Sequence, residues 1–179
     1  PAADDLRPSR QRRQEEARER RGLERLRSKP TRTRDGVDIT LLANAESAED
    51  LARAHALGAA GVGLFRTEFL FLQRDALPDE DEQFHVYRDA VLRMSGRPVT
   101  FRTLDLGADK ADRTGLSLGN EDNPALGVRG LRLSLLHEAV FDTQLRAIAR
   151  AAAYGPVRVL VPMVSCREEV VIVRRRLRR

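Results

Sequence analysis

The sequence predicts an α/β fold with a parallel sheet, because strand-like and helix-like segments alternate along the chain. Four short runs look like strands, at residues 37–43, 61–65, 99–104 and 157–164. Helical patterns separate them, and this order implies right-handed crossovers between parallel strands. The alternative is a small, open, doubly wound sheet. No Gly-x-Gly-x-x-Gly follows the first run, which disfavours that alternative.

The first element is a charged helix. Residues 9–28 are rich in Arg, Glu and Gln, and Leu23 and Leu26 provide only a thin apolar stripe. These features predict a solvated helix that leads into a domain. Pro30 closes this helix, and an Asp-Gly pair shortly after it favours a turn into the first strand.

The next two helices have clear boundary signals. Ser47, with an acidic residue three positions later, is a typical N-cap, and Gly58 is a typical left-handed C-cap. Another helix follows Pro78, with four carboxylates near the positive end of the helix dipole, and Gly96 ends it. We therefore expect one helix in each of the first two crossovers.

The third crossover is longer and less regular. It combines an irregular stretch at 105–124, a short helix near 130–136 and an Ala-rich helix at about 138–153. Four strand–helix units amount to half of a (β/α)8 TIM barrel, which needs roughly 250 residues. We therefore predict a truncated TIM barrel at 35–179, preceded by a basic linker helix at 1–34.

The composition narrows the class of protein. The net charge of +5 is uneven: residues 1–34 hold 12 basic and 6 acidic side chains, and the tail at 174–179 holds five basic ones, so the middle is acidic. One cysteine and three scattered histidines provide neither a disulfide framework nor metal-ligand spacing. No apolar run approaches the ~20 residues that span a bilayer. We expect a cytoplasmic protein and, since the chain starts with Pro and ends in an Arg run, a fragment.

Two arginines follow neighbouring predicted strands. Arg66 comes directly after the second strand and Arg102 lies at the end of the third. Neighbouring parallel strands are about 4.8 Å apart, so both guanidinium groups could bind one small, highly charged ligand. The alternative for Arg66 is a structural ion pair with Glu68 or with a carboxylate on a neighbouring strand.

Three further residues are weaker candidates. Lys110 is either a phosphate contact or a solvated loop lysine. Arg129 follows an ordered-looking Asn-Pro-Ala-Leu-Gly-Val turn, which points it in a definite direction. Asn123 opens that turn, and helix capping explains it almost as well as ligand binding.

Three motifs carry a family resemblance. The segments GVGLFRTEFLF at 61–71, RTLDLGADK at 102–110 and NPALGVR at 123–129 resemble Enzyme I of the bacterial sugar phosphotransferase system. The family is phosphoenolpyruvate–protein phosphotransferase, and the match runs in order from about residue 30 to 170. Pyruvate phosphate dikinases and phosphoenolpyruvate synthases share Arg-Thr-Glu. The Asp-Leu-Gly-Ala-Asp-Lys continuation favours Enzyme I.

The resemblance implies a phosphoenolpyruvate-binding barrel, from which phosphate passes to a histidine on a separate N-terminal domain and then to the carrier protein HPr. It implies a homodimeric parent, Arg66 and Arg102 as phosphoryl ligands, and Arg129 and Lys110 as nearby supports. The family's Mg²⁺ carboxylates, Asn-Asp element, further arginine and proton-donating cysteine lie on later strands and are absent from this sequence. We therefore expect neither a catalytic residue nor a metal ligand here, and an inactive isolated chain.

The remaining reactive side chains have no assigned role. The three histidines, at 55, 85 and 137, do not match the phosphorylated histidine of the family, and Cys166 is interpreted as a plain thiol. A competing hypothesis is that residues 7–34 bind nucleic acid, but acidic residues interleave with the basic ones and no aromatic residue is present. A linker helix is favoured. A non-catalytic interaction module is a third alternative.

Overall fold

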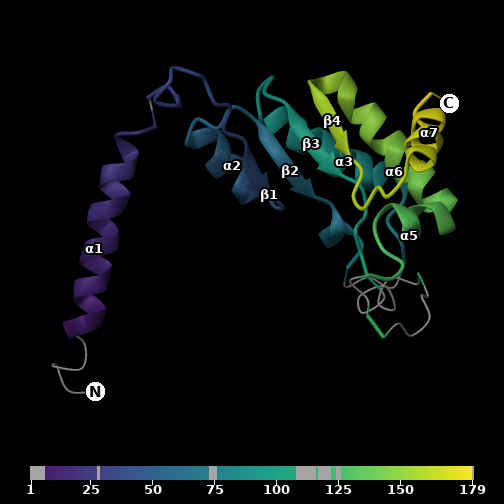
Figure 1. Cartoon of the computed structure of the whole chain (residues 1–179), viewed down its shortest axis with the longest axis horizontal. Coiled ribbons are helices and arrows are strands. Elements are labelled where there is room, and N and C mark those ends of the chain that lie inside the picture. The colour runs from purple at the N-terminus through teal and green to yellow at the C-terminus, as the bar shows by residue number, and fades with distance from the viewer. Residues whose placement is uncertain are drawn as a thin grey trace. The chain divides into compact units, whose positions relative to one another are not determined.

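The computed structural model describes residues 7–27, 29–72, 76–107, 116, 122–123 and 126–178. The chain divides into two compact units, Pro1–Leu41 and Leu42–Arg179 (Figure 1). Each unit is described by itself below.

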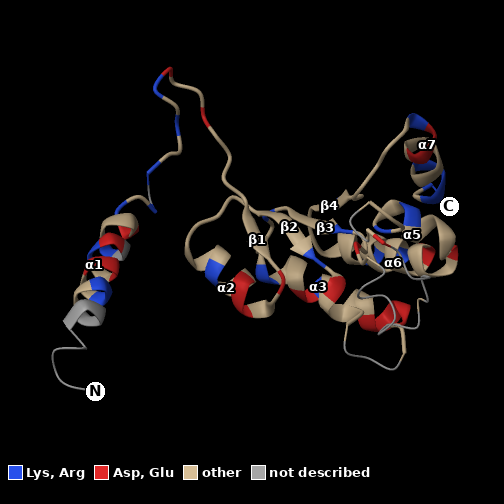
Figure 2. Ribbon diagram, turned by 60° about the horizontal axis from the view of Figure 1, so that its bottom comes forward, with Lys and Arg blue, Asp and Glu red and all other residues tan. Residues whose placement is uncertain are grey.

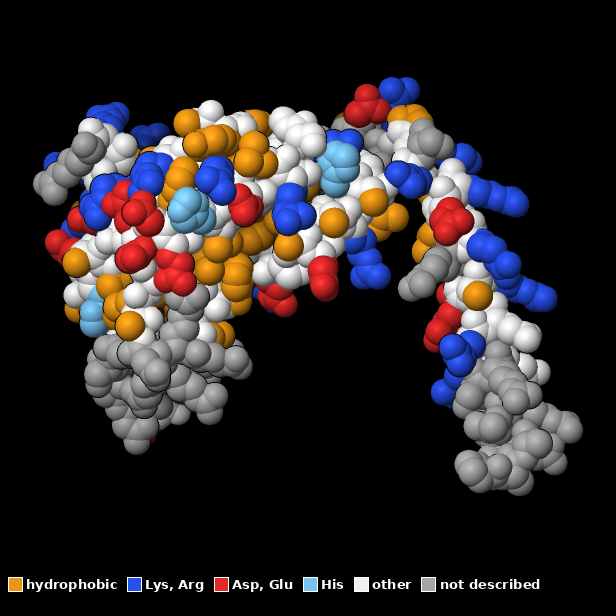
Figure 3. All heavy atoms as spheres, turned by 180° about the vertical axis from the view of Figure 1, so that it is seen from behind, with side chains coloured by type: hydrophobic (Ala, Val, Ile, Leu, Met, Phe, Trp, Pro, Cys, Tyr) orange, Lys and Arg blue, Asp and Glu red, His pale blue; other side chains and the backbone are white. Residues whose placement is uncertain are grey.

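The first unit contains a long solvated helix and a small hairpin. Helix α1 (Arg7–Glu24) is polar, and Leu23 is 64% exposed. Acidic and basic residues are interspersed along it (Figures 2 and 3). After the helix, Arg32 and Asp38 form an antiparallel bridge and a salt bridge of 2.7 Å. The prediction of a solvated helix at the start of the chain is thus confirmed.

The hairpin corrects the first predicted strand. The backbone N–H of Ile39 donates to Thr31, and the carbonyl of Val37 accepts from Thr33, so this stretch pairs locally and does not join the sheet. The first sheet strand is β1 (Ala43–Ala45). The predicted strand at 37–43 was therefore wrong over most of its length, because the Asp-Gly turn folds the chain back on itself first.

The second unit is built on a four-stranded parallel sheet in the order β1-β2-β3-β4. Strand β2 is Val62–Arg66, β3 is Val99–Arg102 and β4 is Val157–Leu160. This confirms the predicted parallel α/β fold and is consistent with a partial barrel. β3 and β4 are shorter than predicted. The backbone N–H of Leu104 donates to a side chain, and Met163 has a φ of +61°, so neither residue continues its strand.

Helices fill the crossovers where the sequence predicted them. They are α2 (Ala48–Ala56), α3 (Glu80–Arg93), α5 (Leu131–Leu136) and α6 (Glu138–Ala151), with 3-10 turns at Glu68–Leu70 and Ala152–Tyr154. Helix α7 (Arg167–Arg176) follows β4 and was not predicted. The Ser47 hydroxyl caps α2 by accepting from the Asp50 N–H at 3.1 Å. Gly58 and Gly96 have φ of +79° and +83°, so both predicted C-terminal glycines are confirmed.

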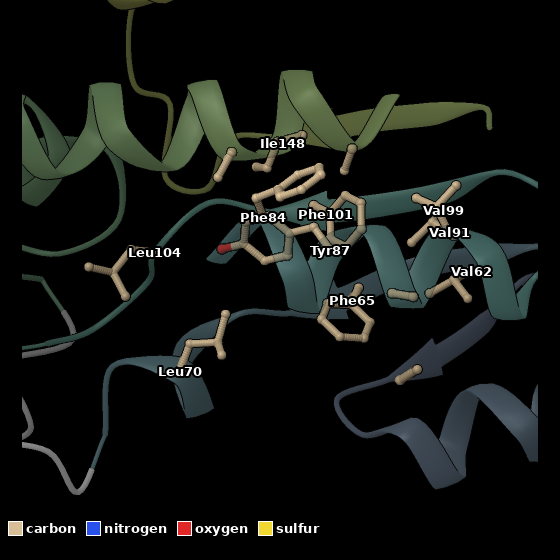
Figure 4. Packing of buried hydrophobic residues seen from close by; sticks show 14 of the residues in the cluster. Val62, Phe65, Leu70, Phe84, Tyr87, Val91, Val99, Phe101, Leu104 and Ile148 are labelled. Carbon is tan, nitrogen blue, oxygen red and sulfur yellow. The ribbon is translucent and has the colours of Figure 1, made fainter. Parts of the chain in front are cut away.

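The core lies between the sheet and helices α3 and α6 (Figure 4). The Phe101 ring packs at 5.3 Å from Phe65 and at 4.8 Å from Tyr87, measured between centroids. Burying one such ring contributes about 1.5–3 kcal/mol. Because Phe65 and Phe101 are directed toward the helices, the residue after each of them points to the opposite face of the sheet.

Candidate functional site

The strand register brings Arg66 and Arg102 side by side. They are paired residues at the ends of β2 and β3, and the preceding Phe65 and Phe101 are paired as well. Since both phenylalanines face the helices, both arginines leave the sheet on the other face, about 4.8 Å apart at the backbone. Their side chains are 46% and 22% exposed. The sheet therefore directs two guanidinium groups to one region of one face.

Arg102 is held by two carboxylates. Its Nη2 donates to Glu68 Oε1 at 2.8 Å, and its Nη1 lies 3.3 Å from Asp105 Oδ2. The Glu68 oxygen also accepts the Asp105 backbone N–H at 3.2 Å. Asp105 is only 7% exposed, so this cluster is shielded from solvent on the carboxylate side. These contacts hold the guanidinium group of Arg102 in one orientation.

Arg129 joins the same cluster from a distant part of the chain. Its Nε donates to Asp105 Oδ1 at 3.0 Å, so Asp105 bridges Arg102 and Arg129. The resulting chain of alternating charges runs from Glu68 through Arg102 and Asp105 to Arg129. Each carboxylate contact restricts the orientation of the guanidinium group that it faces, and the two carboxylates balance the charge of the two arginines.

Arg66 has a looser partner. Its Nη1 lies 3.5 Å from Glu46 Oε2, and both side chains are largely exposed. An exposed ion pair of this kind contributes about 0–1 kcal/mol. Glu46 directly follows β1, the neighbouring strand. The contact of Arg66 in the structure is therefore the ion pair with a neighbouring carboxylate that was the alternative interpretation of this residue. Glu68 instead pairs with Arg102.

Two buried atoms in the cluster lack a hydrogen-bond partner among the described residues. They are Arg102 Nε and Glu68 Oε2. A buried donor without an acceptor costs about 1–3 kcal/mol, so a ligand oxygen that accepts from Arg102 Nε would stabilise this cluster. A ligand that draws the Arg102 fork away from Glu68 could satisfy Nε.

The other predicted residues are placed unequally. Lys110 lies outside the described residues. Asn123 is exposed, and its carbonyl accepts from the Leu126 N–H at 3.0 Å, as in a turn. Cys166 is exposed at the start of α7, where its backbone N–H donates to Glu169. Of the four predicted site residues, three are therefore described, and all three lie at or next to the Arg102 cluster.

The described residues do not fit a magnesium site. Glu46, Glu68 and Asp105 are the carboxylates that contact the arginine pair, and each of them already faces an arginine. Within the part of the chain that the structure describes, no group of three or more His, Cys, Asp or Glu could hold a metal ion.

None of the helices in the described residues combines the length and the apolar character that a membrane-spanning segment needs.

A buried polar layer beneath the arginines was missed from sequence. Thr67, Gln83, Tyr87 and Gln144 are all at most 1% exposed. Burial raises the pKa of Tyr87 well above its ordinary value, so its hydroxyl stays protonated and can donate. Gln144 lies among the apolar positions of α6, and a polar residue on such a face was the available signal.

Comparison with known families identifies the class. Residues 20–179 match the family described as PEP-utilising enzyme, PEP-binding domain, and the chain belongs to this family. The resemblance carried by the three sequence motifs is thereby confirmed.

Individual relatives are more specific. The chain is similar to a phosphoenolpyruvate-protein phosphotransferase from Cupriavidus necator, with 54% identity over 172 residues, or 95% of this chain and 29% of the relative. Proteins of the same name from Geobacillus stearothermophilus and Staphylococcus aureus are 46% and 41% identical, over 78% and 92% of this chain and 24% and 29% of the relatives. The chain thus spans less than a third of the length of these curated relatives.

Proposed function

We propose that the chain supplies the arginine part of the phosphoenolpyruvate site of a phosphoenolpyruvate–protein phosphotransferase. Arg66 and Arg102 bind the phosphoryl group, and Arg129 and Lys110 support them. The observation that carries this proposal is the pairing of Arg66 with Arg102 across adjacent parallel strands. Ligands of parallel α/β sheets bind at the carboxyl ends of the strands, which is where both residues lie.

The chemistry suits phosphoryl transfer. The transferred group carries negative charge on three equatorial oxygens, and catalysis consists mainly of positioning the group and neutralising that charge. A planar guanidinium donates to two of these oxygens at once, whereas an ammonium acts as a point charge. Glu68 and Asp105 fix the Arg102 fork in the ligand-free chain. The phosphoryl group replaces Glu68 as its partner and so satisfies the buried Nε.

The wider activity follows from the family. In this proposal the phosphoryl group passes to a histidine on another domain and then to HPr in cytoplasmic sugar uptake by a homodimeric enzyme. In the same proposal residues 1–34 act as a linker that contains helix α1 (Arg7–Glu24), and residues 35–179 belong to half of a (β/α)8 barrel. Mg²⁺ belongs to the complete site. The chain alone transfers no phosphate, so label from phosphoenolpyruvate should not reach HPr unless a complete Enzyme I is added; labelled HPr without it would contradict this.

Titration calorimetry with phosphoenolpyruvate tests the proposed site in the 179-residue chain. The substitution Arg102→Lys keeps the charge and removes the fork. We expect binding to weaken by about ten- to a hundredfold, since one charged hydrogen bond contributes about 1.5–3 kcal/mol. The control is Arg88→Lys, on the α3 surface, where Arg88 pairs with the exposed Asp89 at 2.8 Å. Equal affinity of the Arg102→Lys and Arg88→Lys chains would refute the role of the fork.

A further inference from the structure

The buried polar layer connects the two arginine-bearing strands. The Thr67 hydroxyl donates to the Arg102 carbonyl at 2.8 Å, which joins the residue after β2 to the last residue of β3. The Gln144 amide donates to this same hydroxyl at 3.1 Å, and its carbonyl accepts the Leu104 N–H at 2.9 Å. One glutamine of α6 therefore contacts the segments that follow both strands.

Helix α3 holds the glutamine in place. The second amide donor of Gln144 reaches the Tyr87 hydroxyl at 3.1 Å. That hydroxyl donates to Gln83 Oε1 at 3.1 Å, and the Gln83 amide donates to the Pro78 carbonyl at 3.0 Å. The Gln144 amide group therefore uses both donors and its acceptor, and the amide can be oriented in only one way without leaving a buried group unpaired.

A network of this kind fixes distances. Moving β2 relative to β3 would break the bond from Thr67 to Arg102 or one of the bonds to Gln144, and each lost bond leaves a buried polar group unpaired. Apolar side chains of the same shape would fill the space and pack as well, but they would not define the separation of the strand ends. Thr67 lies directly between Arg66 and Glu68, so the network acts on residues that bear the site.

We propose that Thr67, Tyr87 and Gln144 are positioning residues, which hold the Arg66 and Arg102 guanidinium groups at the separation that one phosphoryl group requires. This inference rests on the proposed function of the arginine pair. The three residues contact no ligand themselves. They act through the backbone of residues 67, 102 and 104, and small misplacement of binding groups lowers the efficiency of a site steeply.

The first test separates positioning from stability in the 179-residue chain. Thr67→Val keeps the side-chain shape and removes the hydroxyl, and Thr67→Ser restores the hydroxyl. Tyr87→Phe removes one acceptor of the Gln144 amide and serves as a milder second variant. The matched control is Ser134→Ala, because Ser134 is also buried and, among the described residues, its hydroxyl donates to the Gly130 carbonyl, at 3.1 Å, and to no member of the network.

Each of these two substitutions removes two buried hydrogen bonds, which together contribute about 1–3 kcal/mol. Since part of that loss reaches the binding site, we expect Thr67→Val to weaken phosphoenolpyruvate binding about tenfold and Tyr87→Phe, which lies farther from the arginines, about threefold. The affinities of Thr67→Ser and Ser134→Ala should stay within about twofold of that of the unsubstituted chain. For Ser134→Ala this should hold even if its thermal midpoint falls as far as that of Thr67→Val. Loss of affinity that tracks the thermal midpoint across all four variants would overturn the proposal, because it would show a structural role only.

The second test needs no ligand. Arg102 Nε is buried, so its proton should exchange slowly and give an NMR signal in the free chain. We expect this signal to shift and exchange faster in Thr67→Val and to stay unchanged in Ser134→Ala. An unchanged Arg102 signal in Thr67→Val overturns the positioning inference. The two tests are independent. If the unsubstituted chain does not bind phosphoenolpyruvate, the proposed function is refuted. If the Arg102 signal is nevertheless altered in Thr67→Val, the network still controls the position of Arg102.

Discussion

Asp105 is the carboxylate on which the cluster depends most, and Asp105→Asn should destabilise the chain. This change keeps the side-chain shape and removes the charge that faces Arg102 at 3.3 Å and Arg129 at 3.0 Å. Removing one partner of a fully buried pair costs about 3–5 kcal/mol. Arg102 and Arg129 are 22% and 29% exposed, so water compensates part of the loss. We therefore expect a loss of about 2 kcal/mol in the free energy of unfolding.

Urea denaturation followed by circular dichroism measures this loss. Asp89→Asn is the matched control, because it makes the same chemical change in an ion pair of 2.8 Å whose carboxylate is 55% exposed. An exposed pair contributes about 0.2–1 kcal/mol, so the control should lose less than 1 kcal/mol. Equal losses in the two variants would refute the claim that Asp105 is a shielded bridge between two arginines.

Three further outcomes are expected. Two arginines of α6 donate to Glu80 and lower the pKa of its carboxyl, so its ion pairs stabilise the fold fully above the ordinary carboxyl pKa and less as the pH falls through the lowered value. Glu80→Gln should therefore flatten the dependence of the urea midpoint on pH between about 5 and 3. An unchanged pH profile would contradict this. Gly130→Ala should lower the free energy of unfolding by about 1–3 kcal/mol, since the φ of Gly130 is +55° and an added Cβ would lie 2.9 Å from Met163. Gly22→Ala is the control, because a Cβ there meets open space. Equal free energies of unfolding in the two variants would be inconsistent with strain at Gly130. Among the described strands, β1 and β4 lie at the edges of the sheet and pair on one side only, which leaves backbone groups unpaired on the other side. The chain should therefore self-associate in sedimentation at micromolar concentration. A monomer with slow amide exchange along both strands would refute this.

Local signals were sufficient for much of the fold. Ser47, Gly58 and Gly96 are recognisable from sequence because a cap or a left-handed turn depends on neighbouring residues alone. The first strand was misplaced because the alternation of apolar residues at 37–43 is the same in a hairpin and in a sheet strand. Which of the two forms depends on pairing with Thr31 and Thr33, and composition does not encode that choice.

Part of the candidate site could also be predicted from the sequence. The adjacency of Arg66 and Arg102 followed from strand order, since residues at the ends of neighbouring parallel strands must lie together. The roles of Asp105 and Gln144 did not follow, because each contacts partners 24 to 77 positions away along the chain. Such contacts appear only when the crossovers have been placed in space.

The most direct test of the central claim is a crystal structure of the 179-residue chain with phosphoenolpyruvate. The account predicts one phosphoryl group with its oxygens about 3 Å from the guanidinium nitrogens of both Arg66 and Arg102, and Glu68 displaced from the Arg102 fork. A phosphoryl group bound by only one of the two arginines, or bound elsewhere with the Glu68–Arg102 pair intact, would contradict it.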